Sequence, residues 1–507
     1  MRPPSNERAS AFLLTAEQTV RRDVAGGARE ADAQPGDHLF LVLAGASPLA
    51  GGARWSLAGI DEVRFRRGST RAAERESEGG RRILAIKLPD GLISSSHARL
   101  VRASGGFTLV DDGSTNGTFV DGARVTARVL LDGAGFELGA THFMLRLAIA
   151  TPGGTADDLE SASLLGSAFG VASLLPDYAA DLGDLARIAR TELSILLLGE
   201  SGAGKEVLAA AVHRLSGRTG PFVGVNCGAL TPTLMESQLF GHVKGAFSGA
   251  VSDEPGFVRA SNGGTLFLDE IGDLPATSQA ALLRVLETRE VVPVGSTRAV
   301  PVDLRVVSAT LKPEDALRPD LRARLAGFTH RLPPLRERME DFGIILATLL
   351  ARGAGERAAT LKLEPEAGRA LLAHDWPLNV REVKQSLGVA LALVDGPNLA
   401  CKHFPESIFT GVESAASVES AGSVDRAASV ASVPGSPASA DRAPREPALS
   451  PAVVIPKDDA SLRALLVATL EQHRGNVSEV SRALGRTRMQ IHRWMRRVDL
   501  DPQAFRT

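Results

Sequence analysis

The sequence lacks several features that mark specialised classes of protein. Only 4% of its 507 residues are aromatic, and 57 lysines and arginines nearly balance 59 aspartates and glutamates, for a formal net charge of −2. Because the charge is balanced, any basic surface for nucleic acid or membranes must be local. The two cysteines, Cys227 and Cys401, stand far apart. They cannot form a disulfide framework or a four-ligand zinc site.

Long apolar runs are also missing. No run of about 18 apolar residues occurs, so we expect no membrane-spanning helix, and the apolar run near the amino terminus is too short for a signal peptide. Few cysteines and no export signal predict a cytoplasmic protein. A hydrophobic content of 44% and a charged content of 23% exclude a wholly disordered or fibrous chain. The length suggests about three domains.

The pattern of residues changes along the chain. Residues 1–36 are polar and aperiodic, which predicts a flexible leader. Residues 37–149 hold short apolar runs separated by turn pairs such as Asp121-Gly122, which predicts an all-β sandwich or barrel. A glycine-rich linker at 150–161 follows. Over 162–400, buried-strand runs alternate with helical patterns, which predicts an α/β fold.

The remaining part of the chain is expected to be a linker followed by helices. Residues 401–457 include the tandem hexads ESAASV, ESAGSV and DRAASV. A period this short and polar cannot bury a core, so we expect a low-complexity linker. Residues 458–507 are helical in pattern and locally basic. The predicted fold class is therefore multidomain, with all-β, α/β and all-α parts.

A glycine-rich loop follows the apolar run at 195–198 and opens a helical pattern. Its residues are Gly199, Glu200, Ser201, Gly202, Ala203, Gly204, Lys205 and Glu206. Glycines let backbone N–H groups converge on a phosphate, and the helix N-terminus adds a positive dipole. Lys205 would reach the β- and γ-phosphates of a nucleotide. The alternative is a glycine-rich turn without a ligand.

A pair of acids supports the nucleotide interpretation. Asp269 and Glu270 end a buried-strand run after two glycines. Asp269 can hold Mg²⁺, and Glu270 can polarise a water aimed at the γ-phosphate. Such a pair alone could be a solvated strand end. Together with the preceding strand, loop and helix it predicts that ATP and Mg²⁺ bind here.

These motifs resemble the AAA+ domain of sigma-54-dependent bacterial enhancer-binding proteins, whose P-loop normally reads GESGTGKE and so includes Glu206. A second match is to their GAFTGA loop, through Gly245, Ala246, Phe247, Ser248, Gly249 and Ala250. The resemblance implies that Phe247 is an apolar tip on a deformable loop that contacts sigma-54. The alternative is a loop aromatic packed into the core.

The resemblance also implies a homo-oligomeric ring, expected to be a hexamer, with ATP bound between neighbours. Asn226 would restrain Glu270, and Arg318 and Arg324 would reach into the neighbour's site. Thr310 and, from a helical lid, Arg381 would contact the nucleotide. The alternatives are an ordinary turn asparagine, solvated helix arginines and, for Arg381, an ion pair with Glu382 or Asp375.

Three positions depart from the family pattern. Ser248 stands where threonine is usual, so the hydroxyl is kept but the loop is softer. Leu311 stands where the family has a sensor asparagine, and leucine cannot hydrogen-bond a γ-phosphate or its water. Leu378 replaces a usual glycine before Asn379. These departures put the coupling of hydrolysis to motion in question more than nucleotide binding.

The β-rich region resembles a forkhead-associated (FHA) domain, a phosphothreonine reader, in SSSHA at 94–98 and DDGSTNGT at 111–118. The residues implied for phosphothreonine binding are Arg67, Ser94, Ser114, Thr115 and Asn116. Arg66 stands where the family has glycine. Segment 64–82 holds seven arginines against three glutamates, a local field that would attract phosphopeptides. The alternative is a degenerate sandwich with a solvated charged loop.

The carboxyl-terminal segment has helix-turn-helix spacing. Leu462, Leu465, Leu466 and Leu470 share one helix face, Val480, Ala483 and Leu484 should face inward, and Ile491 and Met495 are spaced for the core. The segment LGRTRMQIHRWMRR resembles the Fis-like DNA-binding region of these activators. The residues expected to contact DNA are Arg486, Thr487, Arg488, Gln490, His492, Arg493, Arg496 and Arg497. The alternative is a basic three-helix bundle that binds a protein.

Together these features predict a sigma-54-dependent transcription activator. It would bind enhancer DNA, hydrolyse ATP in a ring and remodel the closed complex of sigma-54 RNA polymerase holoenzyme. A phosphothreonine-containing protein would regulate it through the FHA domain. The alternative is a phosphopeptide-responsive DNA-binding regulator whose AAA+ domain binds ATP without productive remodelling, an interpretation that Leu311 and Ser248 favour.

Overall fold

The structure is a computed structural model that describes residues 33–164, 171–231, 234–311, 316–409, 459–473, 476–484, 491, 494–495, 498, 500 and 502–505. The predicted leader and linker therefore lie for the most part outside the described residues. The chain forms two compact units. One comprises the chain up to residue 368 together with 375–403, and the other comprises 369–374 and 404 onward. The predicted fold class is confirmed.

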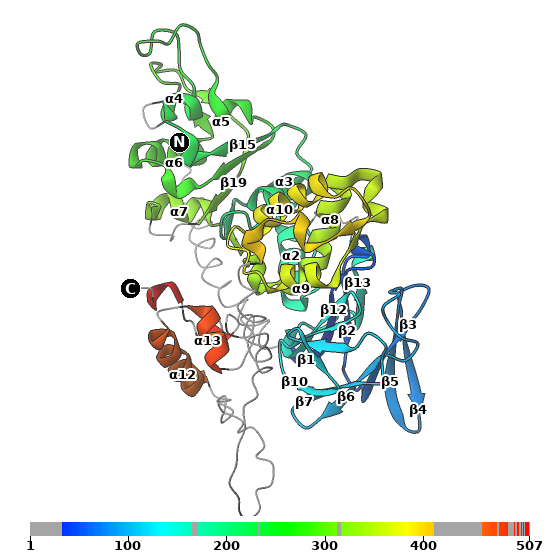
Figure 1. Ribbon diagram of the computed structural model, residues 1–507. Coiled ribbons are helices and arrows are strands. Elements are labelled where there is room, and N and C mark those ends of the chain that lie inside the picture. The colour runs from blue at the N-terminus through cyan, green and yellow to red at the C-terminus, as the bar shows by residue number, and fades with distance from the viewer. Residues whose placement is uncertain are drawn as a thin grey trace, which may run out of the picture. The chain divides into compact units, whose positions relative to one another are not determined.

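The first part of the chain is a sandwich of two sheets (Figure 1, blue to cyan). One sheet has the order β13-β2-β1-β12-β11-β8-β9 and the other β10-β7-β6-β3-β5-β4. The first sheet consists of β1 (Gln34–Ala44), β2 (Ala53–Ser56), β8 (Thr118–Val120), β9 (Ala123–Val125), β11 (Gly135–Leu138), β12 (Thr141–Thr151) and β13 (Asp158–Glu160). The second consists of β3 (Glu62–Arg67), β4 (Ala72–Glu78), β5 (Arg81–Leu88), β6 (Ala98–Ala103), β7 (Gly106–Asp111) and β10 (Ala127–Leu130).

Aromatic packing and tight turns explain why this segment folds as a sandwich. Phe65 of one sheet lies 5.6 Å from Phe136 and 5.1 Å from Phe143 of the other, measured between ring centroids. Asp121 and Gly122, with φ of 54° and 79°, form the two-residue connection between β8 and β9. Both positions need left-handed backbone in such a turn, which aspartate-glycine supplies. The predicted hairpin at this pair is confirmed.

The α/β region is built on a five-stranded parallel sheet in the order β15-β16-β19-β14-β20. Its strands are β14 (Ile195–Leu198), β15 (Phe222–Asn226), β16 (Thr265–Asp269), β19 (Arg305–Thr310) and β20 (Phe328–Arg331). Around it lie α2 (Pro176–Ala189), α3 (Lys205–Ser216), α4 (Met235–Phe240), α5 (Gly256–Ala260), α6 (Ala276–Thr288) and α7 (Pro319–Leu325), with the short pair β17 (Glu290–Val291) and β18 (Val300–Pro301). Every position of β19 is buried, as expected of a strand covered on both faces.

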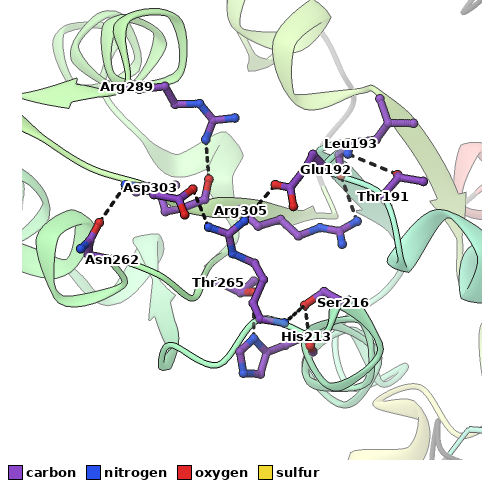
Figure 2. A network of polar contacts seen from close by, with 12 residues as sticks. Thr191, Glu192, Leu193, His213, Ser216, Asn262, Thr265, Arg289, Asp303 and Arg305 are labelled. Atoms are coloured by element: carbon purple, nitrogen blue, oxygen red, sulfur yellow. Dashed lines mark hydrogen bonds and ion pairs between the residues drawn. The ribbon is translucent and has the colours of Figure 1, made fainter.

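Polar side chains close the amino edge of this sheet (Figure 2). Arg305, the first residue of β19, is buried and donates from Nη2 to the carbonyl of Leu193 at 3.0 Å. His213 on α3 points at Thr265, the first residue of β16, with Nδ1 and Oγ1 2.9 Å apart (Figure 2). These contacts fix the loops at the amino edge. Ligands of open α/β sheets bind at the opposite edge, where the strands have their carboxyl ends.

The α/β region is followed by a helical lid. It consists of η6 (Leu335–Glu337), η7 (Met339–Asp341), α8 (Phe342–Ala354), η8 (Gly355–Thr360), β21 (Lys362–Leu363), α9 (Pro365–Ala373), α10 (Asn379–Leu393), β22 (Asn398–Leu399) and η9 (Cys401–His403). Helix α10 packs against α8 (Figure 1). The rings of Phe342 and Trp376 stack 5.9 Å apart and are fully buried.

The sandwich contacts this lid within the first compact unit. Arg146 on β12 forms a buried ion pair with Glu340 of η7, and its Nε lies 3.1 Å from Asp132 Oδ1. The N–H of Leu363 donates to the carbonyl of Gly45 at 2.8 Å. Removal of one partner of a buried ion pair leaves the other charge buried and uncompensated, which strongly destabilises the fold. Arg146 and Glu340 therefore join the sandwich firmly to the lid.

The second unit includes η10 (Glu406–Ile408), α12 (Asp459–Gln472), α13 (Val477–Leu484) and η12 (Pro502–Phe505). Its core contains the predicted apolar positions Leu462, Leu466, Leu470, Val480, Leu484, Ile491 and Met495. Ala483, predicted to face inward, is exposed, because its neighbour Leu484 fills the core instead. Within the described residues, none of the helices combines the length and apolar character that a membrane crossing needs.

Candidate active site

The predicted nucleotide residues meet at the carboxyl edge of the parallel sheet. The P-loop follows β14 and leads into α3, Asp269 ends β16, and Thr310 ends β19. Gly202 and Gly204 have φ of 75° and 115°, which side chains other than glycine rarely adopt. At Gly202 an added Cβ would also lie 2.2 Å from the carbonyl oxygen of Leu378. The glycines thus give the loop its shape and let the lid approach it.

A cavity of about 790 Å³ lies at this edge, between the P-loop and the lid. Among the predicted site residues, those that line it are Ser201, Gly202, Gly204, Lys205, Glu206, Asn226, Asp269, Glu270 and Arg381. Its lid wall includes Arg352, Lys384, Leu349, Leu387 and Leu391, which the sequence reasoning missed. Lys384 could have been found, because it lies one helical turn after Arg381 on the same face.

Lys205 and Glu270 lie side by side in the cavity. The Lys205 ammonium donates to the carbonyls of Gly199 at 2.9 Å and Glu200 at 3.3 Å, and it is 3.6 Å from Glu270 Oε1. The other oxygen of Glu270 accepts the N–H of Leu311 at 3.4 Å. Glu270 has a left-handed backbone, with φ of 50°, a conformation that is rare outside glycine and common at functional sites. The carboxylate is therefore held from two sides.

Asp269 and Asn226 end neighbouring strands and are register partners. The N–H of Glu270 donates to Asp269 Oδ1 at 3.0 Å. Burial raises the pKa of the Asp269 carboxyl above its ordinary value, and the nearby Lys205 ammonium opposes that shift. Asn226 is exposed and faces the same cavity. The strands thus bring an amide and two carboxyl groups to one edge.

Thr310 and Leu311 occupy the end of β19. Thr310 is buried, lies outside the cavity lining, and accepts the Gly199 N–H at its carbonyl, 3.4 Å away. The Leu311 side chain is 54% exposed, while its N–H bonds to Glu270. Its backbone therefore supports the carboxylate even though its side chain has no polar group.

Arg381 and Leu378 lie where α10 begins. Arg381 Nη1 donates to Ser201 Oγ at 2.9 Å, so the lid arginine contacts the P-loop. Leu378 has φ of −101°, a backbone that any residue adopts, so the replacement of glycine at this position causes no strain. Its N–H donates to Glu382 Oε2 at 3.0 Å.

Arg318 and Arg324 lie outside the cavity lining. Arg318 precedes α7, is exposed and donates from Nη2 to Asp320 Oδ2 at 2.8 Å. Arg324 on α7 has Nη2 3.7 Å from Glu287 Oε1. Neither arginine therefore contacts the P-loop cavity of the described chain.

The predicted apolar loop, residues 245–250, is a closed turn. The N–H of Gly245 donates to the carbonyl of Ala250 at 2.8 Å, and the N–H of Ala250 donates to the carbonyl of Phe247 at 3.0 Å. Phe247 is half-buried, and its ring centroid lies 5.0 Å from that of His242. The ring therefore rests on a loop neighbour instead of standing fully exposed or joining the core.

The loops of the sandwich form a second cluster of predicted residues. Arg67 ends β3, is exposed, and donates its backbone N–H to the carbonyl of Ser94 at 3.0 Å. The Thr115 N–H donates to Ser94 Oγ at 3.2 Å, and Asn116 Nδ2 donates to the carbonyl of Leu92 at 2.7 Å. Residues from three loops are thus gathered at one end of the sandwich.

Ser114 and His97 hold these loops from inside. The Ser114 hydroxyl donates to Asp111 Oδ2 at 2.6 Å and accepts the Gly117 N–H at 3.0 Å. His97 is fully buried, accepts the Ser94 N–H at Nδ1 (3.0 Å) and lies 3.2 Å from the carbonyl of Gly117 at Nε2. Burial lowers the pKa of His97. The Ser114 hydroxyl is therefore used within its own loop.

The positive field expected of segment 64–82 is largely neutralised. Arginines of this segment pair with carboxylates in Arg64–Glu62 at 2.7 Å, Arg71–Glu160 at 2.6 Å and Arg75–Asp158 at 2.5 Å. No ion pair is recorded for Arg67 within the described residues. The same holds for its neighbour Arg66, so these two arginines keep an uncompensated positive charge in the segment. The predicted DNA contacts at 486–488, 490, 492–493 and 496–497 lie outside the described residues.

Family models match four parts of the chain. They are the sigma-54 interaction domain over residues 176–329, an AAA+ ATPase lid domain over 336–421, an FHA domain over 79–139 and a bacterial regulatory protein domain of the Fis family over 463–497. The chain belongs to the sigma-54-dependent transcription regulators. Its central region is an AAA+ ATPase domain, and it carries FHA and Fis-type DNA-binding domains on either side.

Relatives of this family are similar over the central region. The hydrogenase transcriptional regulatory protein HoxA of Cupriavidus necator is 45% identical over 234 residues, covering 45% of this chain and 48% of HoxA. The sigma54-dependent transcriptional activator SfnR of Pseudomonas putida is 45% identical over 218 residues, covering 41% of this chain and 59% of SfnR. The chain thus spans about half the length of these relatives. The crystal structure of NtrX from Brucella abortus in complex with ADP matches 67% of this chain and 72% of NtrX, with 27% identity and a TM-score of 0.43.

Proposed function

We propose that this sigma-54-dependent regulator is an activator that hydrolyses ATP to remodel the closed complex of sigma-54 RNA polymerase holoenzyme. The observation that supports hydrolysis is the position of Glu270, between Lys205 at 3.6 Å and the Leu311 N–H at 3.4 Å, in the P-loop cavity. A carboxylate so placed can take a proton from a water that attacks the γ-phosphate. Lys205 would neutralise charge that develops on the phosphates.

Mg²⁺ is part of this proposal, and the residues present fit it. Within the described residues no group of three or more His, Cys, Asp or Glu side chains could hold a metal alone. Mg²⁺ with a nucleotide needs only one or two carboxylates, because phosphates and waters supply the rest. Asp269, beside Glu270 and Lys205, is the residue that would hold the ion. When bound, the ion would neutralise phosphate charge.

The proposal includes a ring of subunits, expected to be a hexamer, with Arg318 and Arg324 reaching the neighbour's ATP. Support comes from their exclusion from the cavity of their own subunit and from the exposure of Arg318. A guanidinium contributed by a neighbour can stabilise transition-state charge and make hydrolysis depend on assembly. The Fis-type domain would bind enhancer DNA. Promoters and RNA polymerase are in the bacterial cytoplasm, so a cytoplasmic location is also part of the proposal.

The alternative is a regulator that binds ATP without remodelling polymerase, and the exposed Leu311 side chain is the observation that favours it. A steady-state ATPase assay combined with an assay of open-complex formation by sigma-54 polymerase separates the two. We expect both ATP turnover and promoter opening. ATP binding without promoter opening would support the alternative.

Phe247→Ala is expected to uncouple the two activities. The ring rests on His242 and is remote from the acids in sequence, so ATP turnover should remain within about twofold of the unmodified protein. Promoter opening should fall at least about tenfold, because the apolar contact with sigma-54 is lost. Open-complex yield and phosphate release are measured in the same reaction. Unchanged promoter opening would show that the loop does not transmit force.

We also propose that the FHA domain binds a phosphothreonine-containing protein. Arg67 would contact the phosphate by charge-assisted hydrogen bonds, with Ser94 and Thr115 as further donors and Asn116 holding the peptide backbone. Support comes from the gathering of these residues at one end of the sandwich, where Arg67 is exposed. The Ser114 hydroxyl would act indirectly, because it is bonded to Asp111.

Arg67→Ala should weaken phosphothreonine-peptide binding about tenfold to 100-fold, because a charge-assisted hydrogen bond to phosphate is lost. Fluorescence anisotropy with a phosphothreonine peptide library measures this. Arg81→Ala is the matched control, since Arg81 is 67% exposed at the other end of β5 and should leave binding unchanged. The assignment is wrong if the Arg67→Ala and Arg81→Ala proteins bind equally well.

A further inference from the structure

Glu200, the second residue of the P-loop, faces the lid instead of the nucleotide cavity. Its two oxygens bind the two terminal nitrogens of Arg336, at 2.5 Å and 2.8 Å. Glu200 is absent from the cavity lining, although it was predicted to bind the nucleotide together with the rest of the loop. The hydrogen bonds from Arg336 lower the pKa of Glu200. This carboxylate is therefore ionised, and both of its oxygens are bonded to Arg336.

Asn379 joins the same cluster from the start of α10. It is fully buried and has φ of 55°, a left-handed backbone that asparagine tolerates better than most residues. Its Nδ2 donates to Glu200 Oε2 and to the carbonyl of Ser201, both at 3.1 Å, and its Oδ1 accepts the Leu335 N–H at 2.7 Å. One side chain thus connects the P-loop with two separate segments of the lid.

We propose that Glu200, Arg336 and Asn379 form a latch that positions the P-loop for ATP. The glycines give the loop conformational freedom, so its N–H groups need an external support to stay aimed at the phosphates. The latch supplies it, and the bond from Arg338 Nη2 to the carbonyl of Ala203, at 2.9 Å, extends the support along the loop. The three residues are positioning residues, because none lines the cavity.

Charge gives a second reason for the latch. A carboxylate next to a polyphosphate site repels the ligand unless a cation neutralises it. The planar guanidinium of Arg336 does so with two parallel bonds, which a lysine ammonium cannot reproduce. The side chains of Glu200 and Arg336 are 32% and 26% exposed, so solvent screens this pair only partly. The affinity for ATP should therefore depend on a lid residue that does not touch it.

The test measures equilibrium affinity for ATP and for ADP in the full-length protein. Glu200→Gln and Arg336→Lys should each weaken binding of both nucleotides about tenfold, the effect of a lost charged hydrogen bond. In the ATPase assay KM should rise while kcat changes less than about twofold, because an equal loss of ground-state and transition-state binding leaves kcat unchanged. Arg187→Ala, which removes a surface pair with Asp184, is the control and should behave as the unmodified protein.

The double variant separates a latch from independent contacts. If Glu200 and Arg336 act only through each other, the double variant should bind ATP no more weakly than the weaker-binding single variant. Additive losses, or normal affinity in both single variants, would overturn the proposal. The proposal would also be overturned if the variants melted at a lower temperature without nucleotide but bound ATP with normal affinity. The residues would then contribute only to the stability of the fold. This inference rests on the ATP site proposed above: if the unmodified protein binds no ATP, that function fails, whereas equal binding by all variants removes only the latch.

Discussion

Glu270→Gln protein should bind ATP and fail to hydrolyse it. Glutamine keeps the shape of glutamate and can still accept the Leu311 N–H, but its amide cannot take a proton from water. General-base catalysis contributes about 100-fold or more, so turnover should fall by at least that factor. Binding should persist, because Lys205 keeps its bonds to the P-loop carbonyls of Gly199 and Glu200. Phosphate release and ATP affinity are measured side by side.

A matched glutamate provides the control. Glu192 is 71% exposed and pairs with Arg218 at 2.9 Å, away from the cavity lining. Glu192→Gln should leave ATP turnover within about twofold of the unmodified protein, because its exposed carboxylate lies away from the cavity. Normal turnover in Glu270→Gln would mean that another group activates the water. The assignment of the acids would then be wrong.

The second large effect is expected from the ion pair between the sandwich and the lid. Arg146→Ala should destabilise the folded protein by about 3–5 kcal/mol, because it leaves the Glu340 carboxylate, 1% exposed, buried without that partner. The double change Arg146→Met with Glu340→Gln should recover much of this loss, since neither charge of the pair then remains buried. Denaturation monitored by calorimetry and by fluorescence measures both variants.

An exposed lysine–glutamate pair is the comparison. Lys87 Nζ lies 2.9 Å from Glu74 Oε1, with side chains 39% and 50% exposed. Lys87→Ala should cost no more than about 1 kcal/mol, because solvent screens exposed charges. Equal destabilisation by Arg146→Ala and Lys87→Ala would contradict the view that the sandwich is joined to the lid by a buried charge pair.

Local sequence patterns predicted the parts of the site that are local in space. The P-loop glycines, Lys205 and the two acids at the end of the β16 segment, Asp269 and the following Glu270, follow from a strand–loop–helix pattern. The turn at Asp121-Gly122 follows from the backbone conformation that this pair prefers. Parallel strands bring their carboxyl ends to one edge, so the meeting of Lys205, Asp269 and Glu270 could be expected. These roles in catalysis stay predictions until the variants are measured.

Contacts made by the lid could not be predicted from the sequence. Arg336 and Glu200 are 136 residues apart, and their bidentate bond depends on how the lid packs against the P-loop. The orientation of the Ser114 hydroxyl toward Asp111 depends on a loop shape that no motif specifies. The resting place of Phe247 on His242 likewise depends on neighbouring loops. Such long-range packing decides which polar groups of a motif remain available to a ligand.

The most direct test of the central claim is to count the open complexes formed by sigma-54 RNA polymerase while ATP is consumed in the same reaction. The account predicts that open complexes accumulate with the unmodified protein and ATP, and that none form with ADP or with Glu270→Gln protein at the same ATP concentration. Open complexes formed by Glu270→Gln protein, or steady ATP consumption by the unmodified protein without any promoter opening, would contradict it.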